Sequence, residues 1–197
     1  MYSIKSVYKI GHGPSSSHTM GPANAAKFFS KKYPNATSYK VTLYGSLALT
    51  GKGHLTDKAI INTFAPKKVE IVWNAKDTSI EHPNTMDLVA YHQDKMLGAL
   101  RIYSIGGGAF TIKGEPANKR EVDVYKLKTA TQILDICKKN KWSLIQFIKK
   151  HEGPELYKHL TKVWAVMTNC IKTGLAASGV LPGKLKLKRH AKEVYTS

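Results

Sequence analysis

The chain has 197 residues, 42% of them hydrophobic, which is enough for one ordinary domain with a sizeable core and an appendage. The formal net charge of +18 comes almost wholly from lysine, and no zinc-finger, RNA-recognition or basic-heptad motif accompanies it, so we expect no specific nucleic-acid partner. No apolar run is long enough to span a membrane, and the first residues lack the apolar core of a secretory signal. We therefore expect a cytoplasmic protein without a membrane partner.

The first two thirds of the chain alternate between helical and strand-like patterns. The elements predicted in chain order are a polar loop at 13–22, a helix over 22–33, a strand over 38–47, a helix over 55–64, a strand over 67–73, a loop over 74–85, a hairpin of strands 86–93 and 97–105, and a strand over 106–114. This order predicts an α+β fold over residues 1–127, with a mixed sheet and helices on one side of it.

From Lys128 onward the periodicity is helical. The predicted helices are 129–140, 143–152 and 154–175, and they form a helical arm over 128–178, which is followed by a polar tail over 179–197. The two cysteines, Cys137 and Cys170, lie in these helices without a C-x-x-C spacing. We therefore expect ordinary helix residues in a reducing compartment, with no zinc or iron–sulfur ligands in this chain.

The polar loop "GPSSSHTMGP" (13–22) carries the first candidate chemistry. Its hydroxyl groups precede a helix start, where free backbone N–H groups attract a carboxylate or phosphate. His18 stands among them and has an ordinary pKa near 6.5, which suits acid–base work. The alternative is an ordinary helix cap with spare serines. The hydroxyl-bearing residues are Ser15, Ser16, Ser17 and Thr19.

A second stretch, "YGSLALTGKGHLTDKA" (44–59), repeats this design. Gly51 and Gly53 permit a close backbone approach, and His54 precedes the next predicted helix. The spacing does not match a phosphate-binding P-loop. If both loops lie on one edge of the sheet, His18 and His54 converge on one ligand.

Two weaker features follow. In "EHPNTM" (81–86), His82 and Asn84 are a possible metal ligand and amide donor, or parts of an ordinary Pro–Asn turn. In "YSIGGGAF" (103–110), consecutive glycines form either an anion-binding nest or a flexible hairpin corner.

Together these stretches resemble a known family. The segments "KIGHGPSSSHTMGPANAAKFF", "VTLYGSLALTGKGHLTDKAI", "HPNTM", "YSIGGGAF" and "GVLPGKLKLKRHA" occur in the order found in bacterial iron–sulfur-dependent L-serine dehydratases, also called L-serine ammonia-lyases. The resemblance implies a β domain over 1–127, similar to allosteric substrate-binding domains, and a helical linker over 128–178. It also implies that residues 179–197 begin an α catalytic domain whose cluster cysteines lie outside this chain.

The resemblance further implies conversion of L-serine to pyruvate and ammonia, with a [4Fe–4S] cluster on an α domain or subunit, in a homo- or hetero-oligomer. It assigns catalytic roles to His18 and His54 and leaves open which of them is the base. The substrate-binding residues that it implies are Ser15, Ser16, Ser17, Thr19, Ser46 and Asn84. The alternatives are a non-catalytic serine-binding regulatory module and an inactive remnant.

Overall fold

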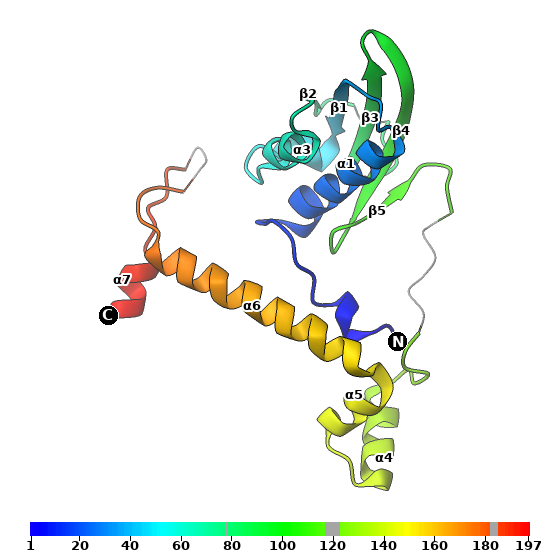
Figure 1. The fold of residues 1–197 in the computed structure, drawn as a ribbon, viewed down its shortest axis with the longest axis vertical. Coiled ribbons are helices and arrows are strands. Elements are labelled where there is room, and N and C mark those ends of the chain that lie inside the picture. The colour runs from blue at the N-terminus through cyan, green and yellow to red at the C-terminus, as the bar shows by residue number, and fades with distance from the viewer. Residues whose placement is uncertain (78, 117–122, 182–184) are drawn as a thin grey trace. The chain divides into compact units, whose positions relative to one another are not determined.

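The computed structural model describes residues 1–77, 79–116, 123–181 and 185–197. They form two compact units (Figure 1). The sheet unit contains residues 11–77, 79–116 and Leu185. The helical unit contains residues 1–10, 123–181 and 186–197. The first ten residues therefore group with the helices, and the domain boundary expected at residue 127 stays a prediction.

A five-stranded mixed sheet organises the sheet unit. Its order is β2-β1-β3-β4-β5, in which β1 and β2 are parallel and the other neighbouring pairs are antiparallel. The strands are β1 (Ser38–Tyr44), β2 (Lys68–Asn74), β3 (Thr85–His92), β4 (Lys95–Gly106) and β5 (Ala109–Ile112). The predicted α+β class with a mixed sheet is confirmed.

The core of the sheet unit lies between one face of the sheet and the helices α1 (Gly21–Lys32) and α3 (Thr56–Phe64), which lie side by side (Figure 1). Alternate residues of β1 point inward, and Val41 lies opposite Leu88 on the buried face. The Tyr39 and Phe64 rings stack with their centroids 3.9 Å apart. The helices predicted over 22–33 and 55–64 are thereby confirmed to within a residue.

Three local features differ from the prediction. The strand expected to reach residue 47 ends at Tyr44, because Gly45 has a φ of +49° and turns the chain into α2 (Gly45–Thr50). The loop before α1 is itself helical, a π-helical turn η2 (Ser16–Met20). The three glycines at 106–108 all have positive φ and turn the chain from β4 into β5. The backbone of this stretch is therefore a hairpin corner.

Three predicted helices of the arm are confirmed as α4 (Ala130–Asn140), α5 (Leu144–Glu152) and α6 (Pro154–Ala176). Reciprocal side-chain caps begin α4 at Thr129 and α5 at Ser143, each with a glutamine three residues later. The short helix α7 (Ala191–Thr196) in the tail is absent from the prediction.

A small core holds the helical unit together. Tyr125, Cys137 and Phe147 are its buried members, and Cys170 is exposed on α6. The Glu152 carboxylate accepts hydrogen bonds from Ser3 Oγ, Ile4 N and Tyr125 Oη, at 2.6, 2.6 and 2.8 Å. These bonds attach the short turn η1 (Ile4–Ser6) to the helices.

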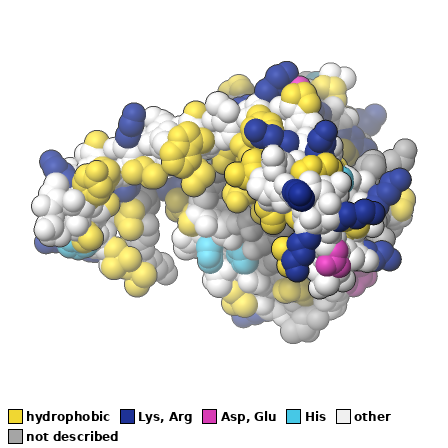
Figure 2. Space-filling view, turned by 90° about the horizontal axis from the view of Figure 1, so that it is seen from below, with side chains coloured by type: hydrophobic (Ala, Val, Ile, Leu, Met, Phe, Trp, Pro, Cys, Tyr) yellow, Lys and Arg dark blue, Asp and Glu magenta, His cyan; other side chains and the backbone are white. Residues whose placement is uncertain are grey.

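The surface is strongly basic. Figure 2 shows lysine and arginine side chains scattered over the visible face, with isolated acidic groups among them. Within the ranges that the structure describes, none of the helices combines the length and the apolar character that crossing a membrane requires.

Candidate functional site

The two histidine loops meet at one end of the sheet unit. His18 lies in η2, directly before α1, and His54 lies in the turn between α2 and α3. Their ring centroids are 4.7 Å apart and the ring planes are inclined by 34°. The sequence analysis expected His18 and His54 to converge if both loops lay at one edge of the sheet. In the structure the two loops do lie together, and the rings are in contact.

A serine cap and a close helix–strand contact hold the His18 loop. Ser15 Oγ accepts a hydrogen bond from His18 N at 3.1 Å, and Ser15 O accepts one from Met20 N at 3.0 Å, which widens the turn. A Cβ atom on Gly21 would lie 2.1 Å from Ser104 Oγ, so glycine is required at this approach to β4. Ser104 Oγ in turn donates to Ser17 O at 2.7 Å.

Hydroxyl groups flank both nitrogens of the His18 ring. Nδ1 is hydrogen-bonded to Ser17 Oγ and Nε2 to Ser46 Oγ, each at 3.0 Å. Burial lowers the pKa of His18, and the nearby His54 lowers it further, while the hydrogen bond to Ser46 opposes the change. His18 is therefore neutral at neutral pH.

The His54 ring has a defined tautomer. Its Nδ1 lies 3.0 Å from Thr50 O, and because a carbonyl oxygen only accepts, Nδ1 must carry the hydrogen. The neutral ring then has its lone pair on Nε2. The next residue, Leu55, has a φ of +55°, a left-handed conformation that is uncommon for leucine and that ends the turn before α3. His54 Nε2 is thus an imidazole nitrogen whose lone pair has no hydrogen-bond partner among the described residues.

Asn84 lies next to this group of residues. Its Nδ2 reaches Ser104 O at 3.4 Å, and Oδ1 is buried with no hydrogen-bond partner in the described part of the chain. A buried acceptor without a donor is costly, so this oxygen would be satisfied by a ligand or water donor. The backbone of the same turn positions Ser46, whose N–H donates to Pro83 O at 2.7 Å.

The remaining predicted residues have different environments. Ser16 is exposed, whereas Ser15 and Ser17 are partly buried. Thr19 is 2% exposed and donates to His54 O at 2.8 Å. The substrate-binding roles of these residues stay predictions. Sequence reasoning gave no role to the hydroxyl of Thr56, which donates to His18 O at 2.6 Å.

The described residues do not fit an iron–sulfur cluster. Such clusters are held by cysteine thiolates, but Cys137 lies in the core of the helical unit and Cys170 is on the surface of α6. Over the described ranges, no three His, Cys, Asp or Glu side chains are grouped as a metal would require. His82, the possible metal ligand, uses Nδ1 to accept from Asn84 N at 3.0 Å. We therefore derive no catalytic step through a cluster in this chain.

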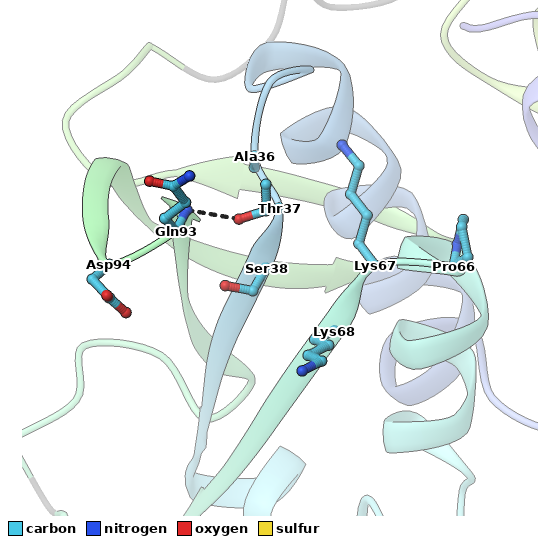
Figure 3. Close-up of a pocket in the computed structure, with 8 residues that line it drawn as sticks. All are labelled: Ala36, Thr37, Ser38, Pro66, Lys67, Lys68, Gln93 and Asp94. Carbon is cyan, nitrogen blue, oxygen red and sulfur yellow. Dashed lines mark hydrogen bonds between the residues drawn. The ribbon is translucent and has the colours of Figure 1, made fainter.

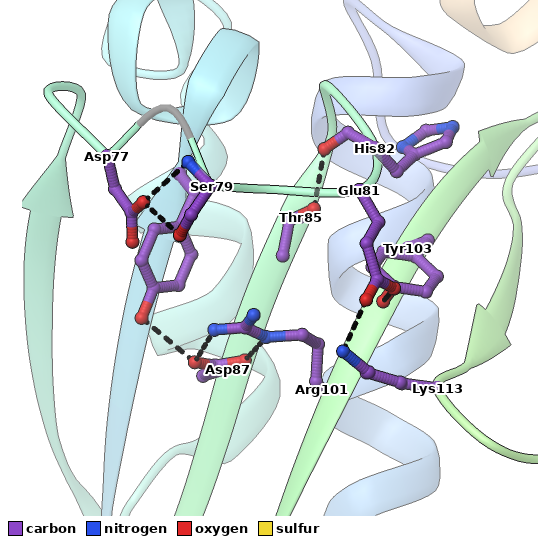
Figure 4. Close-up of polar contacts among 10 residues, drawn as sticks. Asp77, Ser79, Glu81, His82, Thr85, Asp87, Arg101, Tyr103 and Lys113 are labelled. Atoms are coloured by element: carbon purple, nitrogen blue, oxygen red, sulfur yellow. Dashed lines mark hydrogen bonds and ion pairs between the residues drawn. The ribbon is translucent and has the colours of Figure 1, made fainter.

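The sheet face that does not form the core carries a polar network that sequence reasoning missed (Figure 4). The Asp87 carboxylate pairs with Arg101 through two hydrogen bonds of 2.7 and 2.8 Å and accepts one from Tyr44 Oη at 2.9 Å. Burial and the Asp87 carboxylate raise the pKa of Tyr44, and the same carboxylate raises the pKa of Arg101. Because these groups satisfy one another, we assign them a structural role.

A surface hollow of about 640 Å³ lies at the opposite end of β1 from Ser46 (Figure 3). Its lining includes Ser38, Lys67 and Gln93. Lys67 Nζ already donates to Pro34 O at 2.8 Å, and Gln93 N donates to Thr37 Oγ1 at 2.8 Å. The seven residues of β1 span about 23 Å, so this hollow is separate from the histidines.

Comparison with known proteins supports the predicted resemblance. Residues 3–70 match the family described as serine dehydratase beta chain. L-serine dehydratase 2 of Escherichia coli strain K12 is 34% identical over 97% of this chain and 53% of its own length. L-serine dehydratases of Haemophilus influenzae and Helicobacter pylori strain 26695 are 32% and 30% identical over 99% of this chain, covering 54% and 53% of their own lengths.

The resemblance read from the motifs is therefore confirmed: the chain is similar to L-serine dehydratases over nearly its whole length. The family match falls on the segment that contains both histidine loops. The chain spans about half the length of the curated relatives that it matches.

Proposed function

From this relationship to the L-serine dehydratases, we propose that the chain is a component of an L-serine ammonia-lyase that converts L-serine to pyruvate and ammonia. In this proposal a [4Fe–4S] cluster is held by an α domain or subunit outside the chain. The observation that carries the proposal is the meeting of His18 and His54, with ring centroids 4.7 Å apart, from two separate loops. The sequence similarity supports the reaction class, and the geometry supports a site for proton transfer.

We assign the base to His54. The reaction requires removal of a proton from Cα of serine, and an imidazole serves as a general base near neutral pH. Thr50 O fixes the hydrogen on His54 Nδ1 and leaves Nε2 as the acceptor atom. Both ring nitrogens of His18 are hydrogen-bonded, one to Ser17 and one to Ser46. We therefore assign His18 the role of a positioning residue that packs beside the His54 ring.

The serine hydroxyls and the helix start form the binding side of the site. The first N–H groups of a helix have no partner within it and favour an anion such as the substrate carboxylate. Ser15, Ser16 and Ser17 lie at the start of η2. Ser46 is connected to the same turn by its hydrogen bond to the His18 ring. The unmatched Oδ1 of Asn84 is an acceptor suited to an ammonium group.

The activity test combines the chain with an anaerobically prepared, cluster-loaded α polypeptide of an L-serine dehydratase and measures pyruvate formation from L-serine. We expect serine-dependent pyruvate, and a fall of about 10²-fold or more in His54→Ala, because the proton acceptor is lost. His92→Ala is the matched control, since that ring bonds Asn35 O at the far end of the sheet. Absence of pyruvate, where the intact Escherichia coli relative gives it, would overturn the proposal.

The second candidate is a non-catalytic serine-binding or regulatory module. It is favoured by the unpartnered Oδ1 of Asn84 and the hydroxyls of Ser17 and Ser46 at the histidine site, since these groups suit the polar ends of an amino acid whether or not it reacts. Calorimetry of the chain alone with L-serine separates the two candidates. Binding without turnover in the presence of the α polypeptide supports the module, whereas turnover supports the lyase.

A further inference from the structure

Two buried threonines join the histidine loops in a reciprocal arrangement. Thr19, in the His18 loop, donates its hydroxyl to His54 O at 2.8 Å. Thr56, the first residue of α3 after the His54 loop, donates its hydroxyl to His18 O at 2.6 Å. The two threonines are 2% and 0% exposed. Each histidine is therefore held at its own backbone by the loop that carries the other histidine.

These bonds differ from those of threonines elsewhere in the helices. Thr50, Thr63 and Thr168 each donate to the carbonyl four residues earlier in the same helix. This local bond is the usual one for a helical threonine. Thr19 and Thr56 instead bond across 35 and 38 residues of sequence. Their partners are the carbonyls of the two residues whose rings meet.

We propose that Thr19 and Thr56 are positioning residues that fix the mutual placement of the His18 and His54 rings. The catalytic meaning of this placement rests on the function proposed above, but the placement itself is a property of the chain alone. Both rings lie on turns rather than within a regular helix or strand, since His18 is in a π-helical turn and His54 precedes the left-handed Leu55. The two hydroxyls join these turns, one in each direction, in addition to the bonds that Ser17, Ser46 and Thr50 make to the rings themselves.

The first experiment compares Thr56→Val, which keeps the shape but removes the donor, with Thr56→Ser, which keeps the donor. Nitrogen–proton NMR of the histidine rings in the full chain is the readout. We expect Thr56→Val to shift the ring signals of His18 and His54, and Thr56→Ser to restore them. Thr63→Val, whose hydroxyl bonds Ala59 O in the same helix, is the control and should move neither ring. Unchanged ring signals in a folded Thr56→Val chain would overturn the proposal.

Thr19→Val is the second variant, and it is used if the Thr56→Val chain fails to fold. It removes the bond to His54 O together with the bond that Thr19 Oγ1 accepts from Ser15 N, and Thr19→Ser restores both, with the same signals as the readout. Wild-type signals in Thr19→Val would then overturn the proposal.

The kinetic experiment uses the chain reconstituted with the cluster-loaded α polypeptide. We expect Thr56→Val to lower kcat by about 10- to 100-fold, because a small misplacement of reacting groups is enough for that loss, and Thr56→Ser to recover most of it. If the wild-type chain gives no turnover, the proposed lyase function fails, and the ring signals still decide whether the threonines position the histidines.

Discussion

At the scale of single residues, the state of His18 couples the site to pH. Burial and the neighbouring His54 lower the pKa of His18 in the folded chain, whereas an unfolded histidine keeps its pKa near 6.5. As the pH falls, the unfolded chain therefore binds this proton first, and stability present above about pH 6.5 is lost as the pH falls through the folded pKa. The site is best formed when His18 is neutral.

We predict that the urea midpoint of the wild-type chain falls between about pH 7.5 and pH 5.5, and that it falls less in His18→Gln. The physical reason is that glutamine keeps hydrogen-bonding groups near Ser17 and Ser46 but has no proton to gain. Thr63→Val changes no titratable group and removes only the bond to Ala59 O within α3, so it should retain the whole of the wild-type fall. An equal fall in His18→Gln and the wild type would show that another group is responsible.

At the scale of elements, the chain order of the sheet unit could be predicted because its periodicities are strong. Val41 and Leu43 alternate with polar neighbours in β1, and the apolar stripe of α1 surrounds Ala25 and Phe29. The helix α2 was missed because Leu47 and Leu49 also alternate as in a strand, while the turn depends on the positive φ of Gly45. Short segments of this kind are decided by tertiary contacts.

In the candidate site, too, some features could be predicted from local sequence pattern and others depend on tertiary contacts. Sequence pattern predicted both loops and both histidines, because serines and glycines before a helix are visible locally. The bond from Ser46 to His18 and the bond from Thr56 to His18 O join residues 28 and 38 positions apart. No local pattern specifies such partners, since they depend on how α1 and α3 pack.

The junction of η2 and α1 with β4 gives a prediction for an element. Gly21→Ala should destabilise the chain by about 1–3 kcal/mol, because the added Cβ would overlap the buried Ser104 hydroxyl. Urea unfolding measures this loss. Gly53→Ala is the matched control, since its Cβ would have Thr50 O as its nearest neighbour at 3.4 Å. If both variants lost the same stability, close packing at Gly21 would not be the cause.

At the scale of the whole molecule, the division into two compact units places every proposed site residue in one of them. His18, Ser46, His54 and Asn84 belong to the sheet unit, which has its own buried core. The helical unit has a smaller core, centred on Phe147 and Tyr125, whose rings stack with centroids 5.8 Å apart. The proposed chemistry of this chain therefore rests on residues of the sheet unit alone.

This separation predicts the outcome of a core substitution in the helical unit. Phe147 is 1% exposed, so Phe147→Ala should remove about 3–5 kcal/mol from the packing of that unit. We expect circular dichroism to report a loss of helix at a lower temperature, while the NMR ring signals of His18 and His54 keep their wild-type positions. Leu144→Ala, at a side chain that is 48% exposed, should change neither measurement by much. Ring signals that shift together with the helix loss would mean that the histidine site needs the helical unit intact, and the site would then have to be assigned to the chain as a whole.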